Sequence, residues 1–147
     1  MDTNLFERRR SGQSVDRQGA PFHSLQVLVV DDEPAIREVL AIMLATDGHT
    51  VLTACDSEDA LRKLELREWD IVMTDRAMPG MGGDELAARI KDKRPLLPVI
   101  LLTGYTGPME SAGPHARMID GIIKKPFTGS ELREGIERAL LAVHHAG

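Results

Sequence analysis

The sequence predicts a doubly wound α/β fold in which helices cover both faces of a five-stranded parallel sheet. Two observations support this prediction. Short apolar runs rich in β-branched residues, typical of strands buried on both faces, recur along the chain. Amphipathic helical segments separate most of these runs, and such alternation is typical of parallel sheets with right-handed crossovers. We expect the strand order 2-1-3-4-5, which places the second strand at an edge of the sheet.

The predicted strands are short, mostly apolar segments. They cover residues 25–30, 50–54, 71–74, 99–103 and 121–124. The predicted helices have apolar residues three or four positions apart, which form one stripe on a helical surface. They cover residues 34–47, 56–66 and about 83–92, with a last helix that opens at residues 128–131. Glycines and prolines between residues 104 and 114 predict that a fourth helix, between the last two strands, is short or distorted.

Several residues mark the expected helix ends and the expected core. Pro34 suits a first helical turn, Gly48 suits a helix end, and residues 128–131 fit a capping box. The single cysteine, Cys55, is expected to be a small buried residue at a strand end. The predicted buried stripe of the first helix consists of Ile36, Val39, Leu40, Met43 and Leu44.

The composition limits the class of protein. At 147 residues, of which 42% are hydrophobic, the chain is long enough for one domain with a proper core. Its net charge of −5 argues against nucleic-acid binding through a broad basic surface. One cysteine cannot form an intrachain disulfide, no apolar run is long enough to span a membrane, and the charged N-terminus lacks the apolar segment of a signal peptide. We therefore expect a cytoplasmic protein in which residues 1–24 form a flexible polar tail.

Polar residues stand at the ends of four predicted strands. Asp31 and Asp32 follow the first strand, and Asp75 follows the third. Thr103 ends the fourth strand, and Lys125 follows the fifth. In a parallel sheet all of these positions lie at the carboxyl edge, where open α/β proteins bind their ligands. We therefore expect three carboxylates to share one shallow pocket with a hydroxyl and an ammonium group.

This combination of groups suits phosphoryl transfer. Neighbouring carboxylates repel one another unless a cation neutralises them, and Mg²⁺ prefers oxygen ligands. One carboxylate can act as a nucleophile while a lysine and a threonine stabilise the phosphoryl oxygens. Taken singly, Asp32 could be a helix cap, Thr103 a strand-end residue and Lys125 a surface lysine. Their common place at one edge of the sheet favours a shared site in which Asp75 is the working residue.

Four segments of the chain occur in an order that matches a known family. They read Val-Val-Asp-Asp-Glu-Pro at residues 29–34, Thr-Asp-Arg-Ala-Met-Pro-Gly-Met-Gly-Gly at 74–83, Leu-Leu-Thr-Gly-Tyr at 101–105 and Lys-Lys-Pro-Phe at 124–127. Together they resemble the receiver domain of two-component response regulators. The resemblance implies a flavodoxin-like receiver domain over residues 25–144.

The resemblance also implies an acceptor and a metal site. Asp75 would take a phosphoryl group from a histidine kinase or a histidine phosphotransfer protein and form an acyl phosphate. Asp32 and Asp75 would ligate Mg²⁺ together with the backbone carbonyl of Ala77. Asp31 would contribute to the same site directly or through water.

The remaining motif residues fit the family less uniformly. By resemblance, Thr103 would hydrogen-bond the phosphoryl oxygens, Lys125 would pair with them, and Pro126 would follow a cis peptide bond. The family often has an aromatic switch residue two positions into the fifth strand, where this chain has Ile122. Tyr105 is the only nearby aromatic residue, so activation is expected to differ from the usual coupling of a threonine to an aromatic residue.

The expected output is a change in protein binding. Because the sequence stops at Gly147, just after the last predicted helix, we expect a stand-alone receiver with no direct DNA binding and no membrane contact. A receiver from a hybrid sensor kinase would look the same. The phosphorylation state would control a downstream partner protein or pass to a phosphorelay. Such a domain is a signalling module that catalyses its own phosphorylation and dephosphorylation.

Two other classes of protein fit the sequence less well. A phosphatase of the haloacid-dehalogenase type also uses an aspartate nucleophile with Mg²⁺, but it needs a second aspartate two residues later, where this chain has Ala77. A nucleotide- or flavin-binding domain would need a glycine-rich phosphate loop after the first strand, and none is present.

Overall fold

The computed structural model describes residues 24–104 and 117–146. Its strands form one sheet with the order β2-β1-β3-β4-β5, and each neighbouring pair is parallel. The predicted doubly wound architecture and strand order are therefore confirmed. The strand bounds are Gln26–Val30 for β1, Thr50–Ala54 for β2, Ile71–Asp75 for β3, Val99–Thr103 for β4 and Gly121–Lys124 for β5.

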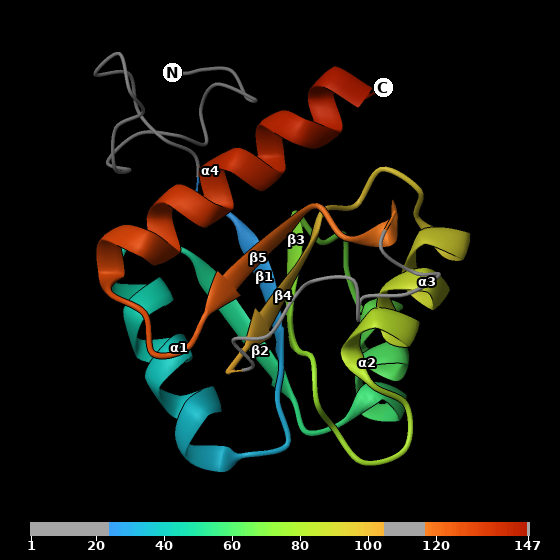
Figure 1. Ribbon diagram of the computed structural model, residues 1–147, viewed down its shortest axis with the longest axis horizontal. Helices are drawn as coiled ribbons and strands as arrows, with labels where there is room; N and C mark the ends of the chain where they lie inside the picture. The colour runs from blue at the N-terminus through green and yellow to red at the C-terminus, as the bar shows by residue number, and fades with distance from the viewer. Residues whose placement is uncertain (1–23, 105–116, 147) are drawn as a thin grey trace.

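Helices cover both faces of this sheet. Figure 1 shows α1 and α4 on one face and α2 and α3 on the other. The expected short fourth helix falls on residues 105–116, and nearly all of the expected tail falls on residues 1–23, so both predictions concern residues outside the described ranges. The helix bounds are Pro34–Thr46 for α1, Ser57–Leu64 for α2, Gly83–Lys93 for α3 and Gly129–Ala146 for α4.

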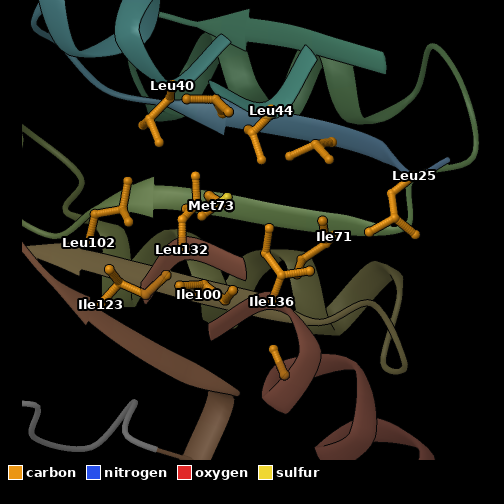
Figure 2. Close-up of a cluster of buried hydrophobic side chains, with 13 residues drawn as sticks. Leu25, Leu40, Leu44, Ile71, Met73, Ile100, Leu102, Ile123, Leu132 and Ile136 are labelled. Atoms are coloured by element: carbon orange, nitrogen blue, oxygen red, sulfur yellow. The ribbon is translucent and has the colours of Figure 1, made fainter. Parts of the chain in front are cut away.

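The core consists of two layers, one on each face of the sheet. Along β1, Val27 and Val29 belong to the layer under α1 and α4, whereas Leu28 and Val30 belong to the layer under α2 and α3. Figure 2 shows the first layer, where Leu40 and Leu44 of α1 lie on the same face of the sheet as Leu132 and Ile136 of α4. Because successive side chains in a strand point to opposite faces, a strand covered on both sides needs apolar residues at every position. This requirement explains the continuous apolar runs in the sequence.

The helix ends follow the local signals in the sequence. The Asp56 carboxylate accepts the Asp59 N–H at 2.8 Å and caps the start of α2. At the start of α4, Thr128 and Glu131 exchange two hydrogen bonds of 2.9 and 3.1 Å, which confirms the predicted capping box. Gly48, just beyond α1, has a φ of 95°, a conformation that glycine adopts without strain.

Two predictions about burial were wrong. Val39 is 49% exposed, because Leu40 and Leu44 form the side of α1 that faces the sheet. Val39 precedes Leu40 by one residue and is therefore rotated about 100° around the helix, away from that side. Cys55 is exposed because it follows Ala54, the last residue of β2, and therefore lies outside the sheet.

Within the described residues, no helix combines the length and apolar character that a membrane crossing requires.

His49 makes the stability of the fold depend on pH. It is buried directly before β2, and its Nδ1 accepts the Leu25 N–H at 3.1 Å. Burial lowers the pKa of His49 and outweighs the opposing effects of the Asp47 and Asp70 charges. The unfolded chain therefore binds more protons than the folded chain once the pH falls below about 6.5. The stability that neutral His49 contributes is complete above that pH and is lost as the pH falls toward the folded-state value.

We expect the free energy of unfolding to decrease between about pH 7.5 and pH 5.5, and to decrease less in the variant His49→Asn. Asparagine keeps a hydrogen-bond acceptor for the Leu25 N–H but does not titrate. Urea denaturation of both proteins at the two pH values measures the difference. Equal decreases in the two proteins would show that His49 does not carry this dependence.

Candidate functional site

The structure brings the predicted polar residues together at the carboxyl edge of the sheet, and all of them except Asp31 line one pocket there. Asp31 follows β1, Asp75 ends β3, Thr103 ends β4 and Lys125 follows β5. The pocket has a volume of about 750 Å³. Its lining consists of Asp32, Glu33, Asp75, Arg76, Ala77, Asp84, Thr103, Gly104 and Lys125.

Three carboxylates form an acidic cluster at this edge of the sheet, where Asp32 and Asp75 line the pocket and Asp31 is buried beside them. Asp31, Asp32 and Asp75 each offer an oxygen atom, and these atoms lie within 4.8 Å of one another. Asp31 is fully buried and Asp75 is 8% exposed, whereas Asp32 is open to solvent. An exposed position beside two buried carboxylates suits a hard divalent cation that keeps part of its water shell. The donor set therefore fits Mg²⁺.

Lys125 is the cation that faces this cluster. Its Nζ lies 3.0 Å from Oδ1 of Asp75 and 3.3 Å from Oδ2 of Asp31. Burial by itself lowers the pKa of Lys125, but the hydrogen bond to Asp75 and the charge of Asp31 outweigh it and raise that pKa. Lys125 is therefore held as an ammonium group between the two buried carboxylates.

The pKa of Asp75 is raised above its ordinary value. Burial is the largest cause, and the negative charges of Asp31 and Asp32 add to it, while the hydrogen bond from Lys125 opposes them. The cluster holds three carboxylates close together. A bound divalent cation would relieve this repulsion.

The turn after β3 holds the Asp75 backbone in place. The Arg76 N–H donates to the Leu102 carbonyl at 2.9 Å, and the Gly83 N–H donates to the Arg76 carbonyl at 2.9 Å. A Cβ atom on Gly83 would lie 2.3 Å from the Asp75 carbonyl oxygen, so only glycine lets α3 begin this close to β3. Met78, which is buried, anchors the first part of the same turn in the core.

The strands on the other side of the pocket place Thr103 and Lys125. The Lys125 N–H donates to the Thr103 carbonyl at 2.8 Å, so the two residues stay in register beyond the end of β5. Thr103 is 3% exposed and lines the pocket. The Lys125–Pro126 peptide bond is cis, which confirms that prediction. Ile122 lies on β5 with 41% of its surface exposed, and Tyr105 lies outside the described residues.

The structure adds residues to the site that sequence reasoning did not identify. Arg37 reaches from α1 to donate to the Asp31 carbonyl at 2.7 Å. Asp84, in the first turn of α3, and Arg76 both line the pocket. The place of Asp84 directly after the Gly82–Gly83 pair was a usable signal, because it puts a carboxylate in the first turn of a helix that starts at the carboxyl edge of the sheet. Arg37 left no comparable signal in the sequence.

An acidic pocket with a lysine, at the carboxyl edge of a sheet with this strand order, is the arrangement that the resemblance to receiver domains predicts. The sequence matches the model of the response regulator receiver domain family over residues 27–137, and the chain belongs to this family. The resemblance seen in the four motifs is thus confirmed.

Known relatives and structures agree with this assignment. TcrA, a transcriptional regulatory protein of Mycobacterium tuberculosis, is 32% identical over 123 residues, which cover 84% of this chain and 49% of TcrA. The DNA-binding transcriptional regulator NtrC of Escherichia coli is 34% identical over 114 residues, which cover 78% of this chain and 24% of NtrC. The chain therefore spans about half or less of the length of these curated relatives.

Two solved receiver structures superpose over nearly their whole length. The chemotaxis protein CheY4 of Vibrio cholerae has a TM-score of 0.74 and 30% identity, covering 80% of this chain and 99% of CheY4. The response regulator TrrA of Thermotoga maritima, solved in complex with Mg²⁺-BeF, has a TM-score of 0.72 and 36% identity. That match covers 79% of this chain and 99% of TrrA.

Proposed function

We propose that Asp75 accepts a phosphoryl group from a phosphohistidine of a histidine kinase or histidine phosphotransfer protein. The observation that carries this proposal is the position of Asp75. Asp75 is 8% exposed in the pocket, clustered with Asp31 and Asp32, and its carboxylate lies 3.0 Å from the Lys125 ammonium group. Asp31 also faces Lys125, but it is fully buried and does not line the pocket, so Asp75 is the carboxylate that the pocket exposes beside the lysine.

The proposed transfer is a displacement at phosphorus. An oxygen of the Asp75 carboxylate bonds to phosphorus while the bond to the histidine nitrogen breaks, and the electron pair stays on the imidazole. The product is an acyl phosphate on Asp75. Lys125, already at the acceptor carboxylate, pairs with a phosphoryl oxygen, and the Thr103 hydroxyl donates to another. Hydrolysis returns Asp75 to its unphosphorylated state. Water attacks phosphorus and releases inorganic phosphate and the free carboxylate.

The proposed metal ligands are the carboxylates of Asp31, Asp32 and Asp75 with the backbone carbonyl of Ala77. The all-oxygen donor set and the close approach of the three carboxylates support Mg²⁺. The Mg²⁺-BeF complex of TrrA is consistent with this proposal. When bound, Mg²⁺ supplies positive charge for the phosphoryl oxygens. Arg37 keeps the Asp31 backbone in place, and the turn after β3 carries Ala77 along the edge of the pocket.

The proposed output is phosphorylation-dependent binding of a partner protein, or relay of the phosphoryl group to a further histidine. The DNA-binding role in the name of NtrC belongs to a protein about four times as long as the matched region, so we do not carry it to this chain. With Ile122 exposed on β5, we propose that the signal leaves the pocket without an aromatic switch on that strand. We also propose a cytoplasmic location, because a single cysteine suits a reducing compartment.

The experiment that tests the proposed function uses a small phosphoryl donor such as acetyl phosphate. With Mg²⁺, the protein is expected to gain one phosphoryl group, measured as intact mass, and excess EDTA is expected to prevent the gain. A receiver is expected to release no phosphate repeatedly from phosphomonoesters, whereas a haloacid-dehalogenase-type phosphatase would do so. A folded protein that gains no phosphoryl group, or that turns over phosphomonoesters, would contradict the proposal.

A further inference from the structure

We infer that Ser57 is a positioning residue of the phosphorylation site, because its hydroxyl holds the loop that carries Ala77. Ser57 lies on α2 and lines no part of the pocket. The inference rests on the proposed function, since it concerns how the proposed metal ligands are kept in place.

A hydrogen bond joins α2 to this loop. Oγ of Ser57 donates to the backbone carbonyl of Met81 at 2.8 Å, across 24 positions of the sequence. Ser57 is 3% exposed, so water has little access to compete for the bond. If the serine hydroxyl is removed, the Met81 carbonyl is left without a hydrogen-bond donor in a place that water reaches poorly, and this is energetically unfavourable.

The donor itself is rigidly held. Asp56 caps α2 through the Asp59 N–H, and the Asp59 carboxylate accepts the Cys55 N–H at 3.1 Å. Asp59 also pairs with Lys63 at 3.0 Å, and Lys63 donates to the Thr53 carbonyl at 2.7 Å. The end of β2, the turn after it and the first turn of α2 therefore form one connected network. Ser57 is part of that first turn, so this network holds its backbone, and therefore its hydroxyl group, in place.

The acceptor lies in a short loop whose ends are already fixed. The Gly83 N–H closes the loop onto the Arg76 carbonyl, and Met78 is buried under it. Gly80, with a φ of 78°, turns the chain between Met78 and Met81. The Ser57 bond adds a fixed point after this turn, on the side of the loop that faces α2.

When a short loop is held by only a few contacts, the loss of one contact lets the neighbouring residues of the loop move as well. Ala77 is four residues before Met81 and lines the pocket. Mg²⁺ demands nearly ideal octahedral geometry, so a carbonyl ligand must be held within narrow limits. Without the Ser57 hydroxyl, the loop samples more conformations, and the Ala77 carbonyl is in place for a smaller fraction of the time.

The test compares Ser57→Ala with Trp69→Phe and Ser57→Thr. Trp69 is also buried and donates through Nε1 to the Lys63 carbonyl at 3.2 Å, so Trp69→Phe removes a similar bond from the other end of α2. Ser57→Thr keeps the hydroxyl. Hydrogen exchange of the amides at residues 80–83 in the Mg²⁺-free protein reports on the loop. NMR titration with Mg²⁺ gives the dissociation constant, and urea denaturation gives the global stability of each variant.

For Ser57→Ala, we expect loop exchange to become about three- to tenfold faster and Mg²⁺ binding about three- to tenfold weaker. Trp69→Phe is expected to lose global stability with neither effect, and Ser57→Thr is expected to stay within about twofold of the wild type. If Ser57→Ala and Trp69→Phe change loop exchange equally, the inference is wrong. Absence of Mg²⁺ binding in the wild type would instead count against the proposed function, and loop exchange would still decide the role of Ser57.

Discussion

Replacing Lys125 with methionine is expected to cost the Mg²⁺-free protein about 1–3 kcal/mol of unfolding free energy. The lysine faces Asp31, which is fully buried, and Asp75, whose side chain is 11% exposed. Removing the ammonium group leaves both carboxylates without their nearby positive charge. Saturating Mg²⁺ is expected to recover part of the loss, because the ion supplies charge to the same cluster. The rate of phosphorylation is expected to fall about 100-fold, as when one donor to a developing negative charge is removed.

Urea denaturation with EDTA and with Mg²⁺ measures the stability change. Lys124→Met is the matched control, because Lys124 is the neighbouring lysine and its side chain is exposed on β5. The control is expected to change stability by less than about 0.5 kcal/mol. Equal losses in the two variants, or a loss in Lys125→Met that Mg²⁺ leaves unchanged, would contradict this account of the cluster.

Replacing Gly83 with alanine is expected to destabilise the fold by about 2–4 kcal/mol. The added Cβ would lie 2.3 Å from the Asp75 carbonyl oxygen and 3.1 Å from the Arg76 Cα. Both atoms belong to the backbone, so α3 must move away from β3 to make room. The movement pulls on the turn that presents Asp75, and phosphorylation is expected to slow as well.

Gly129→Ala provides the control for the Gly83 variant. Gly129 begins α4, and the nearest atom to a Cβ there belongs to the flexible side chain of Arg133, at 3.4 Å. Its unfolding free energy is expected to stay within about 0.5 kcal/mol of the wild type. Urea denaturation compares the two substitutions, and a small effect for Gly83→Ala would show that α3 is not packed on β3 as closely as described.

Much of the fold could be predicted from the sequence, because strands buried on both faces leave continuous apolar runs. The segments at 50–54 and 99–103 coincide with β2 and β4. Residues at the helix ends were equally informative. Thr128 forms the predicted capping box at the start of α4, and Gly48 has the positive φ that suits a glycine after a helix. Strand ends then located the pocket, because parallel strands bring their carboxyl ends to one edge.

Contacts between distant side chains could not be predicted in this way. The exposure of Val39 depends on which side of α1 meets the sheet. The apolar stripe in the sequence does not show which residues at its edges are buried. The bond between Ser57 and Met81 joins two segments whose packing depends on both α2 and α3. The raised pKa of Asp75 depends on burial and on three neighbours, two of which follow β1 and one of which follows β5. Each of these properties arises only once the elements have packed together.

The position of the phosphoryl group tests the central claim most directly. Protein phosphorylated with Mg²⁺ and acetyl phosphate is reduced with borohydride, which converts an aspartyl phosphate to homoserine, and its peptides are analysed by mass spectrometry. Asp92→Asn, which replaces an exposed carboxylate on α3, is the control for Asp75→Asn. We expect homoserine at position 75 in the wild type and in Asp92→Asn, and no phosphoryl group in folded Asp75→Asn. Homoserine at another position, or an undiminished mass gain in Asp75→Asn, would contradict the assignment of Asp75 as the acceptor.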